Sequence, residues 1–454
     1  MNTDLIIIGS GPGGYRAAEY AAKNGLQVVI VESAQAGGTC LNCGCIPTKA
    51  FCHDAELAAL GIHADFPEIV ERKQAIVNQL RSGVETLMQM PGITFVHGHA
   101  HFSSATSADG QTVVEVVSTT TEHETVVQQF TAPNVIIATG SRTKMLPIPG
   151  ITGPCCVTST ELLDIQQVPD KLCIIGAGVI GMEFASIFSG FGSEVTVVEF
   201  LKECLPAMDS DIAKRLRKQL EKRGVKFFMQ AGVKKVEDRV VTFERKGKEE
   251  SVEADVILVA TGRTPNIENL NLDAVGVLYD RTGIKVDPET YRVEWADSAS
   301  TKPSGTNIFA IGDVNGRQML AHAATMQGIR AVNTILGRAD GIRLDIMPAA
   351  VFTTPEAACV GPTEDQLKAD GCEYVCHKGY YRANGKALTM EATDGLVKLF
   401  TDPDDRIIGC HILGAHAADL VQEVSALMNR DTTLAQLREI VHIHPTLGEI
   451  LQDL

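Results

Sequence analysis

Apolar runs alternate with glycine-rich turns in a way that predicts a repeated nucleotide-binding unit. Residues 5–8 are four consecutive apolar residues, as expected of a parallel strand that is buried on both faces. A glycine-rich turn follows, then a helical stretch over residues 15–24 that Gly25 ends, and then a second apolar strand over residues 28–31. This order of strand, turn, helix and strand makes a complete βαβ unit.

The same pattern recurs in the middle of the chain. Residues 173–175 predict a strand, residues 176–181 a glycine-rich turn, residues 182–190 a helix and residues 195–198 the next strand. Two such units imply two bound dinucleotides and two doubly wound α/β domains.

The segments between and after these units predict further elements. Residues 70–90 predict a helix, and residues 97–130 alternate apolar and polar positions as in an antiparallel meander. Residues 135–140 and 256–262 form a matched pair of strands, each ending in Ala-Thr-Gly. Beyond about residue 343 the pattern changes to a mixture of strands and helices, which predicts a third, α+β unit.

Composition limits the class of protein. The 454 residues contain 44% apolar residues and 41 glycines, which indicates a globular chain of about three domains. A net charge of −16 argues against a nucleic-acid partner, because binding phosphates needs a basic surface. No apolar run reaches the roughly 18 residues that a membrane helix needs, and no signal peptide precedes the first strand. We expect a cytoplasmic protein, or a mature chain whose targeting segment is missing.

Each glycine-rich turn has the residues that a dinucleotide needs. In the first turn Gly9 makes the tight bend, Gly11 lets the backbone approach a pyrophosphate, and Gly14 lets helix and strand pack closely. Glu32, which ends the next strand, would accept hydrogen bonds from ribose hydroxyls. The same roles are expected in the second unit for Gly176, Gly178, Gly181 and Glu199.

The acidic residue of the second unit also selects between nicotinamide cofactors. A carboxylate at Glu199 would repel a 2′-phosphate and bind a free 2′-hydroxyl, and only Lys202 follows it closely as a cation. The sequence therefore favours NAD over NADP.

A cysteine pair follows the first unit. Cys40 and Cys45 lie with four residues between them in a segment framed by Pro47 and several glycines, a setting that suits a disulfide opening and closing beside a redox cofactor. The alternative is that both are ordinary buried cysteines, which pack as small hydrophobes. Twelve cysteines are too few for a disulfide scaffold, so the others indicate a reducing compartment.

Two further motifs carry candidate chemistry. Gly312 and Asp313 follow an apolar strand and precede the segment Met319, Leu320, Ala321 and His322. Near the C-terminus, His444 is followed by Pro, Thr and, five residues on, Glu449. An imidazole suits deprotonation of a thiol, and a carboxylate could hold its tautomer and stabilise the imidazolium. Taken singly, His322 and His444 would be read as structural.

In their order along nearly the whole chain, these motifs resemble those of the pyridine-nucleotide disulfide oxidoreductases, whose cofactors are FAD and a nicotinamide nucleotide. The resemblance implies that Cys40 exchanges with a dithiol and that Cys45 forms the charge-transfer thiolate against the flavin. It implies that Asp313 binds the ribityl chain near the flavin phosphates, and that Lys49 and Glu183 form an ion pair beside the flavin. The remaining residues that it assigns to cofactor binding are Thr139, Gly140, Gly262, Met319, Leu320, Ala321 and His322.

The resemblance also implies domains and an oligomeric state. It predicts an FAD-binding domain over residues 1–147, an NAD-binding domain over 148–270, a central part over 271–342 that completes the FAD region, and an interface domain over 343–454. In this family each site combines the disulfide of one subunit with the histidine of the other, so a homodimer is expected. No metal site is expected.

Within the family, Glu199 and residues 319–324 and 381–387 look most like the dihydrolipoamide dehydrogenases. The expected reaction is oxidation of free or protein-borne dihydrolipoamide with NAD, and a 2-oxoacid dehydrogenase or glycine-cleavage complex is the candidate partner. Two alternatives remain: a reductase of another disulfide, and a catalytically silent flavin-binding subunit of a larger complex. Cys43 departs from the family pattern, which has an aliphatic residue there, and the chain stops five residues after Glu449.

Overall fold

A computed structural model describes residues 2–62, 64–119, 125–296 and 303–454. The chain forms two compact units. The first comprises Met1–Pro47, Arg72–Lys144 and Arg263–Leu344, and the second comprises Thr48–Glu71, Met145–Gly262 and Asp345–Leu454. Each unit is therefore assembled from three separate stretches of the chain.

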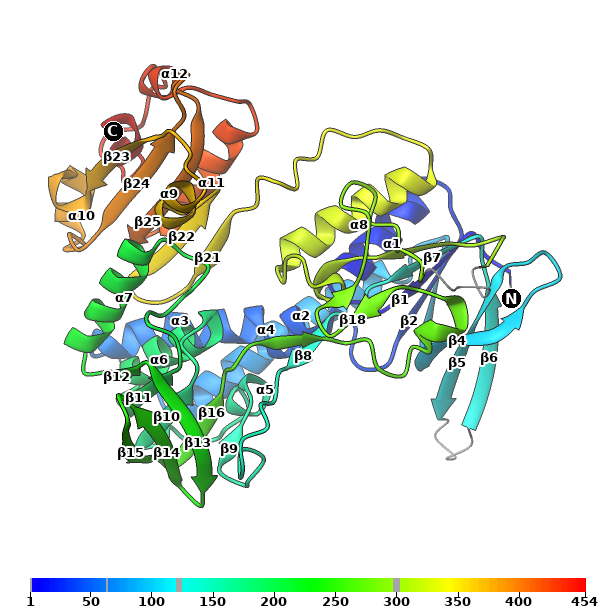
Figure 1. Ribbon diagram of the computed structural model, residues 1–454, viewed down its shortest axis with the longest axis horizontal. Coiled ribbons are helices and arrows are strands. Elements are labelled where there is room, and N and C mark those ends of the chain that lie inside the picture. Colours follow the sequence, from blue (N-terminus) through cyan, green and yellow to red (C-terminus); the bar gives the residue numbers. More distant parts are fainter. Residues whose placement is uncertain (1, 63, 120–124, 297–302) are drawn as a thin grey trace. The chain divides into compact units, whose positions relative to one another are not determined.

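The first unit is built on a five-stranded parallel sheet. Its strands are β1 (Leu5–Ile8), β2 (Val28–Glu32), β3 (Ile93–His97), β7 (Asn134–Ile137) and β20 (Asn307–Ala310), in the order β20-β7-β1-β2-β3. The strands β1, β2 and β7 are buried at every position, which explains their continuous apolar sequences. Helices α1 (Pro12–Lys23) and α8 (Ala321–Ile335) pack against each other beside this sheet (Figure 1).

A second sheet in this unit is antiparallel. It contains β4 (His99–Thr106), β5 (Thr112–Thr119) and β6 (Thr125–Thr131), as the alternation over residues 97–130 predicts. Residues 120–124 of that prediction lie outside the described residues. The remaining elements of the unit are α2 (Gly38–Cys43), β8 (Ser141–Thr143), β17 (Arg263–Pro265), β18 (Tyr279–Asp280), β19 (Gly283–Ile284), η1 (Leu272–Val275) and η2 (Gly312–Asn315).

The second unit repeats the parallel sheet. Its strands are β9 (Cys156–Val157), β10 (Lys171–Ile175), β11 (Glu194–Glu199), β12 (Lys226–Met229) and β16 (Val256–Val259), in the order β12-β11-β10-β16-β9. Helix α6 (Val179–Gly190) connects β10 to β11, and a three-stranded antiparallel sheet of β13 (Ala231–Glu237), β14 (Val240–Arg245) and β15 (Lys248–Glu253) is inserted before β16. Helices α5 (Ser159–Leu162) and α7 (Ser210–Lys222) complete this part.

The C-terminal part of the second unit is an α+β fold. Its antiparallel sheet contains β21 (Ala349–Val351), β22 (Glu356–Val360), β23 (Val375–Tyr380), β24 (Leu396–Thr401) and β25 (Ile407–Gly414), in the order β21-β22-β25-β24-β23. Helix α11 (Ala417–Met428) packs on β22 and β25 (Figure 1). The shorter helices are α9 (Glu364–Ala369), η3 (Tyr381–Ala383), α10 (Gly385–Thr389), α12 (Leu434–Arg438) and α13 (Glu449–Gln452).

Two long helices, α3 (Cys45–Ala59) and α4 (Phe66–Leu87), belong to both units by sequence. The fold class is confirmed: two doubly wound dinucleotide-binding folds and a C-terminal α+β domain. The predicted starts of both nucleotide-binding helices were wrong by about one turn. Gly11 and Gly178 adopt extended conformations and cap α1 and α6, so the glycines that follow lie inside the helices.

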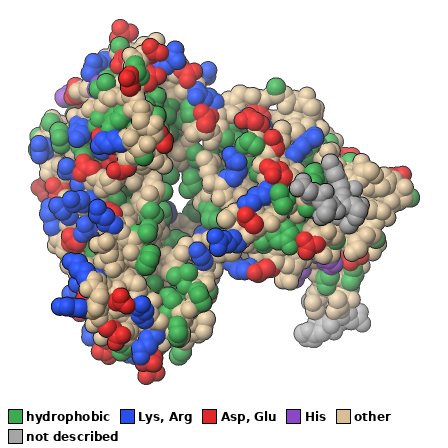
Figure 2. All heavy atoms as spheres, in the orientation of Figure 1, with side chains coloured by type: hydrophobic (Ala, Val, Ile, Leu, Met, Phe, Trp, Pro, Cys, Tyr) green, Lys and Arg blue, Asp and Glu red, His purple; other side chains and the backbone are tan. Residues whose placement is uncertain are grey.

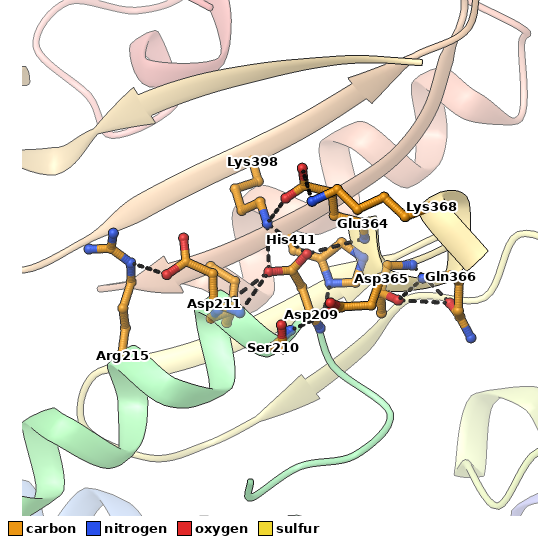
Figure 3. A network of polar contacts seen from close by, with 12 residues as sticks. Asp209, Ser210, Asp211, Arg215, Glu364, Asp365, Gln366, Lys368, Lys398 and His411 are labelled. Atoms are coloured by element: carbon orange, nitrogen blue, oxygen red, sulfur yellow. Dashed lines mark hydrogen bonds and ion pairs between the residues drawn. The ribbon is translucent and has the colours of Figure 1, made fainter. Parts of the chain in front are cut away.

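A buried polar network joins α7 to the C-terminal sheet within the second unit (Figure 3). The ammonium group of Lys398 in β24 lies 2.7 Å from both carboxylate oxygens of Asp209, the N-cap residue of α7, and 2.7 Å from Glu364. Lys398 and Asp209 are almost completely buried. Burial alone would lower the pKa of Lys398, but its hydrogen bonds to Asp209 and Glu364 outweigh burial and raise that pKa.

Candidate active site

The two glycine-rich turns have the same local geometry. Gly9 and Gly176 have φ values of +103° and +108°, and a Cβ on either would lie 2.4 Å from the carbonyl oxygen of Ala138 or Ala260. Only glycine fits such a turn, because a side chain would need an unfavourable backbone conformation and would clash. The two turns therefore hold the chain in one shape at the ends of β1 and β10.

The other glycines separate into a packing role and a binding role. A Cβ on Gly14 or Gly181 would lie about 2 Å from the carbonyl oxygen of the first glycine in its turn, so both allow the helix to approach the strand. A Cβ on Gly11 or Gly178 would meet nothing within 4 Å. Both backbones therefore face open space at a helix N-terminus, where a pyrophosphate fits.

The two acidic residues hold matching positions. Glu32 accepts hydrogen bonds from the Ser10 and Ala34 N–H groups, each at 2.8 Å. Glu199 accepts from the Ala177 and Leu201 N–H groups, each at 2.6 Å. Both carboxylates are buried, and these contacts hold them beside the turn of their own unit. A dinucleotide ribose would be placed against each of them, so both turns fit their expected cofactors.

The Ala-Thr-Gly motif after β7 is joined to the segment after β16. Thr139 Oγ1 donates to the Asn266 carbonyl oxygen at 2.7 Å, and the Asn266 N–H donates to the Gly140 carbonyl oxygen at 2.9 Å. Gly140 and Gly262 both have positive φ values. Asn266 was not predicted as a site residue, although it stands in the motif that follows Gly262. The structure shows that it fixes the end of β7.

Asp313 lies in a polar cluster that the sequence did not predict. Its carboxylate accepts a hydrogen bond from the Ser141 hydroxyl, and the Arg263 guanidinium donates to the same hydroxyl at 2.7 Å. The Gly312 N–H donates to the buried side chain of Gln327 at 2.8 Å. This cluster holds the Gly-Asp turn against α8, in the first unit, where a ribityl chain is expected.

The segment after the Gly-Asp turn leads into α8. Met319 and His322 are exposed, Leu320 is the N-cap residue of α8, and Ala321 is its first residue. A Cβ on Gly13 of α1 would lie 3.0 Å from the Ala324 carbonyl oxygen, which shows how closely the first turns of the two helices pack. The segment therefore begins beside the helix that carries the first nucleotide-binding turn.

Cys40 and Cys45 lie at the junction of two helices. Cys40 is in α2, and Cys45 is the first residue of α3. Gly44 connects them, and a Cβ on Gly44 would lie 2.9 Å from the Thr39 carbonyl oxygen and 3.3 Å from Cys40 Cα. The chain thus turns back on α2, which brings the start of α3 beside Cys40. A Cβ on Gly38 would lie 2.6 Å from Gly11 Cα, so α2 also starts against the first nucleotide-binding turn.

Asn42 fixes the position of α2, and sequence reasoning did not assign it a role. Its amide group donates to the carbonyl oxygens of Ala36 and Gly38, both at 2.9 Å. Its own oxygen accepts from Arg81 of α4 at 2.7 Å. The signal was present, because Asn42 stands in the cysteine motif between Cys40 and Cys45.

Lys49 and Glu183 form the expected ion pair. Lys49 Nζ lies 2.8 and 2.9 Å from the two carboxylate oxygens of Glu183, whose side chain is buried. The Phe352 N–H also donates to Glu183 at 2.9 Å, and the Phe352 ring centroid lies 4.7 Å from Lys49 Nζ. Phe352 was not predicted, and it contacts both members of the pair.

His444 and Glu449 form the expected histidine–carboxylate pair. Glu449 Oε1 lies 2.8 Å from His444 Nδ1, while Glu449 Oε2 accepts from the Thr446 N–H at 2.8 Å. The Thr446 contact and then the His444 ring lower the pKa of Glu449. The His444 side chain is 80% exposed, so its Nε2 can reach a substrate or a partner surface. The neighbouring His442 is instead held by Glu423 at 2.8 Å, which supports a structural role for it.

Burial makes the thiols of several other cysteines harder to ionise. Burial raises the pKa of the Cys52 and Cys173 thiols to about 12 and that of Cys359 to about 11, and it also raises those of Cys204 and Cys410. A thiol must ionise before it can exchange with a disulfide. Thiol chemistry at these five positions is therefore suppressed.

On the face shown in Figure 2, acidic and basic side chains of the described residues are interspersed. Among the helices that the structure describes, none combines the length and apolarity that crossing a membrane requires.

Comparisons with known proteins agree with this geometry. Residues 3–328 match the family described as Pyridine nucleotide-disulphide oxidoreductase, and residues 347–454 match its dimerisation domain. The chain is 37% identical over 471 residues to Leghemoglobin reductase of Glycine max, covering 99% of this chain and 86% of that protein. It is 36% identical over 472 residues to Dihydrolipoyl dehydrogenase of Staphylococcus aureus, covering 100% of this chain and 96% of that protein.

Two solved structures are also similar over almost their full lengths. The HOCl-induced flavoprotein disulfide reductase RclA from Escherichia coli, solved as a Cu(II) complex, is 29% identical with a TM-score of 0.86, covering 100% of this chain and 99% of RclA. LpdA from Mycobacterium tuberculosis is 27% identical with a TM-score of 0.87, covering 99% of this chain and 98% of LpdA. The chain belongs to the pyridine nucleotide-disulphide oxidoreductase family, and its cofactors are FAD and NAD.

Proposed function

We propose that this member of the pyridine nucleotide-disulphide oxidoreductases oxidises dihydrolipoamide, or a protein-borne dihydrolipoyl group, to the disulfide and reduces NAD. The observation that carries the proposal is the His444–Glu449 pair on an exposed loop, since oxidation of a dithiol needs a base that removes thiol protons. Full-length identity of 36–37% to proteins named dihydrolipoyl dehydrogenase supports the substrate.

The first step is thiol–disulfide exchange at Cys40. His444 takes the proton of one substrate thiol, and the thiolate attacks the Cys40 sulfur of the Cys40–Cys45 disulfide, so that Cys45 leaves as a thiolate. The second substrate thiol then attacks the substrate sulfur bonded to Cys40, and its proton passes to the Cys40 sulfur. The substrate disulfide forms, and Cys40 leaves as the second thiol of the reduced pair. Two electrons have then passed from the substrate to the cysteines.

FAD held at the first glycine-rich turn and NAD held at the second would supply the two-electron redox chemistry that takes these electrons from the cysteines. The chain's own residues position each participant. The glycine-rich turns bind the pyrophosphates, and Glu32 and Glu199 orient the riboses. Lys49, one helical turn after Cys45 in α3, holds a positive charge that Glu183 and Phe352 fix in place. We assign to this charge the stabilisation of the negative charge that develops beside the flavin.

The matched dimerisation domain supports a homodimer, and we propose that each site takes its histidine from the partner subunit. The loop that carries His444 supports this, because it exposes Val441 and Ile443 at 92% and 78%. Apolar side chains exposed to this degree are typical of a surface that another protein covers. A lipoyl-bearing subunit of a larger complex is the proposed source of substrate, and the cytoplasm is the proposed location.

The second candidate is a reductase that acts on another disulfide. The similarity to the disulfide reductase RclA favours it. A catalytically silent subunit is disfavoured because Cys40, Cys45, His444 and Glu449 are all present, and a silent subunit needs none of them.

Steady-state assays of a panel of dithiols and disulfides, each with NAD and NADP, test the proposal. We expect dihydrolipoamide with NAD to give the highest kcat/KM. Higher activity with another disulfide would favour the second candidate. If none of the dithiols changes the flavin spectrum, the protein is a silent subunit.

A further inference from the structure

The redox segment contains a third cysteine that the proposed reaction does not use. Cys43 is the last residue of α2, and Cys40 lies three residues before it in the same helix. The three cysteines thus combine a Cys-X-X-Cys pair, Cys40 and Cys43, with the wider pair of Cys40 and Cys45. All three are at least partly accessible to solvent.

Helix geometry places Cys43 within bonding range of Cys40. Residues three apart share one helix face, and in an α-helix their Cα atoms are about 5 Å apart. Disulfides join Cα atoms separated by about 4.4–6.8 Å, so the Cα separation of this pair lies within the range. Gly44 ends α2 with φ −140° and ψ −112°, a conformation that glycine adopts more readily than other residues.

The start of α3 favours release of Cys45 in such an exchange. Cys45 is the first residue of a 15-residue helix, where backbone N–H groups and the helix dipole stabilise a thiolate. Lys49 adds a positive charge one turn further along the same helix. A nucleophile that attacks Cys40 therefore displaces a good leaving group.

We propose that the active-site disulfide of this enzyme isomerises. The Cys43 thiolate attacks the Cys40 sulfur of the Cys40–Cys45 disulfide, a Cys40–Cys43 disulfide forms, and Cys45 leaves as a thiolate. One disulfide and one thiolate are present before and after the step, so neither an oxidant nor a reductant is consumed. Attack of Cys45 on Cys40 reverses it.

The isomer holds the active-site disulfide in a second position. Its disulfide lies within α2 and Cys45 is already a thiolate, so the Cys40–Cys45 bond that the proposed reaction opens is absent until Cys45 attacks Cys40. Cys43 therefore acts as a thiol–disulfide switch, which changes the bonding partner of Cys40 without changing the oxidation state of the centre. This inference rests on the proposed function, because it takes Cys40 and Cys45 as the redox pair.

Differential alkylation of the oxidised holoenzyme tests the switch. N-ethylmaleimide is added first, the protein is then reduced, and the released thiols receive an isotopically distinct iodoacetamide. Fragment ions of the peptide spanning residues 24–49 assign each label. We expect N-ethylmaleimide on Cys45 in part of the wild-type enzyme, and on neither Cys40 nor Cys45 in Cys43→Val. The rate at which Cys45 becomes labelled should rise about tenfold per pH unit below the pKa of the attacking thiol.

A second variant tests whether the Cys40–Cys43 disulfide can form, whatever the equilibrium between the two disulfides in the wild type. Cys45→Ser treated with oxidised dithiothreitol should lose two thiols by forming the Cys40–Cys43 disulfide, and Cys45→Ser/Cys43→Val should not. If only Cys43 is labelled in the oxidised wild type, or if Cys45→Ser loses no thiols, the switch is wrong while the redox pair stands. Labelling of both Cys40 and Cys45 in the oxidised enzyme would instead overturn the proposed function.

Discussion

Lys49 Nζ lies 2.8 Å from one carboxylate oxygen of Glu183 and 2.9 Å from the other. The Glu183 side chain is only 4% exposed, whereas that of Lys49 is 32% exposed. Removing the lysine therefore leaves a buried carboxylate whose one other described hydrogen bond comes from the Phe352 N–H. An uncompensated buried charge destabilises a fold more than loss of the whole pair does.

The first prediction follows from this asymmetry. Lys49→Met should lower the melting temperature of the holoenzyme by about 2–4 °C, and Lys49→Met/Glu183→Met should recover part of that loss because both charges are gone. Differential scanning fluorimetry measures both. Lys235→Met is the matched control, since it breaks an exposed pair with Glu237 and should change little. If the double variant melts at a lower temperature than Lys49→Met, the unpaired Glu183 carboxylate is not the cause of the lost stability.

The second prediction concerns cofactor choice. Glu199→Ala frees the N–H groups of Ala177 and Leu201, and Phe200→Arg adds a cation at a side chain that is 76% exposed. Together they should accept a 2′-phosphate and shift the ratio of kcat/KM for NAD over NADP by at least about tenfold toward NADP. Steady-state assays with both nicotinamides measure the ratio, and Phe200→Ala serves as the control. An unchanged ratio would show that Glu199 does not determine the preference for NAD over NADP.

The sheets could be predicted because their strands are buried on both faces. Strands β1, β2 and β10 contain runs of four apolar residues, and in β11 only Thr196 interrupts the apolar run. The glycines after β1 and β10 have backbone shapes that only glycine adopts readily. The starts of α1 and α6 were predicted about one turn too late. The glycines at the start of each helix have the same sequence signature as a turn.

The supporting contacts of the site could not be predicted, because they join residues that are far apart in the chain. Phe352 contacts Glu183 across 169 positions, and Arg81 reaches Asn42 across 39. Neither local propensity nor motif spacing contains this information. Asn42 was visible as a motif residue, but its role depends on α4. The ion pair of Lys49 and Glu183 was predicted through the family resemblance alone.

The third prediction concerns acid stability. The hydrogen bond from Lys398 holds the pKa of Glu364 at about 2, below its ordinary value. A carboxylate with a depressed pKa stabilises the fold above its ordinary pKa, and this stabilisation is lost as pH falls toward the depressed value. The melting temperature of the wild type should therefore exceed that of Glu364→Gln near neutrality, and the difference should shrink from about pH 5 to about pH 2.5. Glu244→Gln, which breaks an exposed pair with Lys234, is the control. A difference that stays constant with pH would contradict the assignment.

The fourth prediction separates the two members of the histidine pair. His444→Gln should lower dithiol oxidation by about 10²–10⁴-fold, because it removes the base. Glu449→Gln should cost less, since the amide can still accept from His444 and what is lost is the charge that stabilises the imidazolium. Electron transfer from NADH to a dye should be nearly unchanged in both, because no thiol proton is removed. Loss of the dye reaction would point to damage at the cofactor sites instead.

The last prediction concerns the shared site. Cys45→Ser and His444→Gln should each be inactive with dithiol, but mixing them should restore activity if each site takes its cysteines from one subunit and its histidine from the other. In a mixed dimer one site then carries both substitutions and the other carries neither, so the dimer should have about half the activity of the wild type. Differently tagged chains allow mixed dimers to be purified, which rules out slow subunit exchange as the cause of a negative result. If His444 served the cysteines of its own chain, every site in the mixed dimer would carry one substitution, and purified mixed dimers would stay inactive. That outcome would remove the proposed role of the dimerisation domain in catalysis while leaving the thiol chemistry of Cys40 and Cys45 intact.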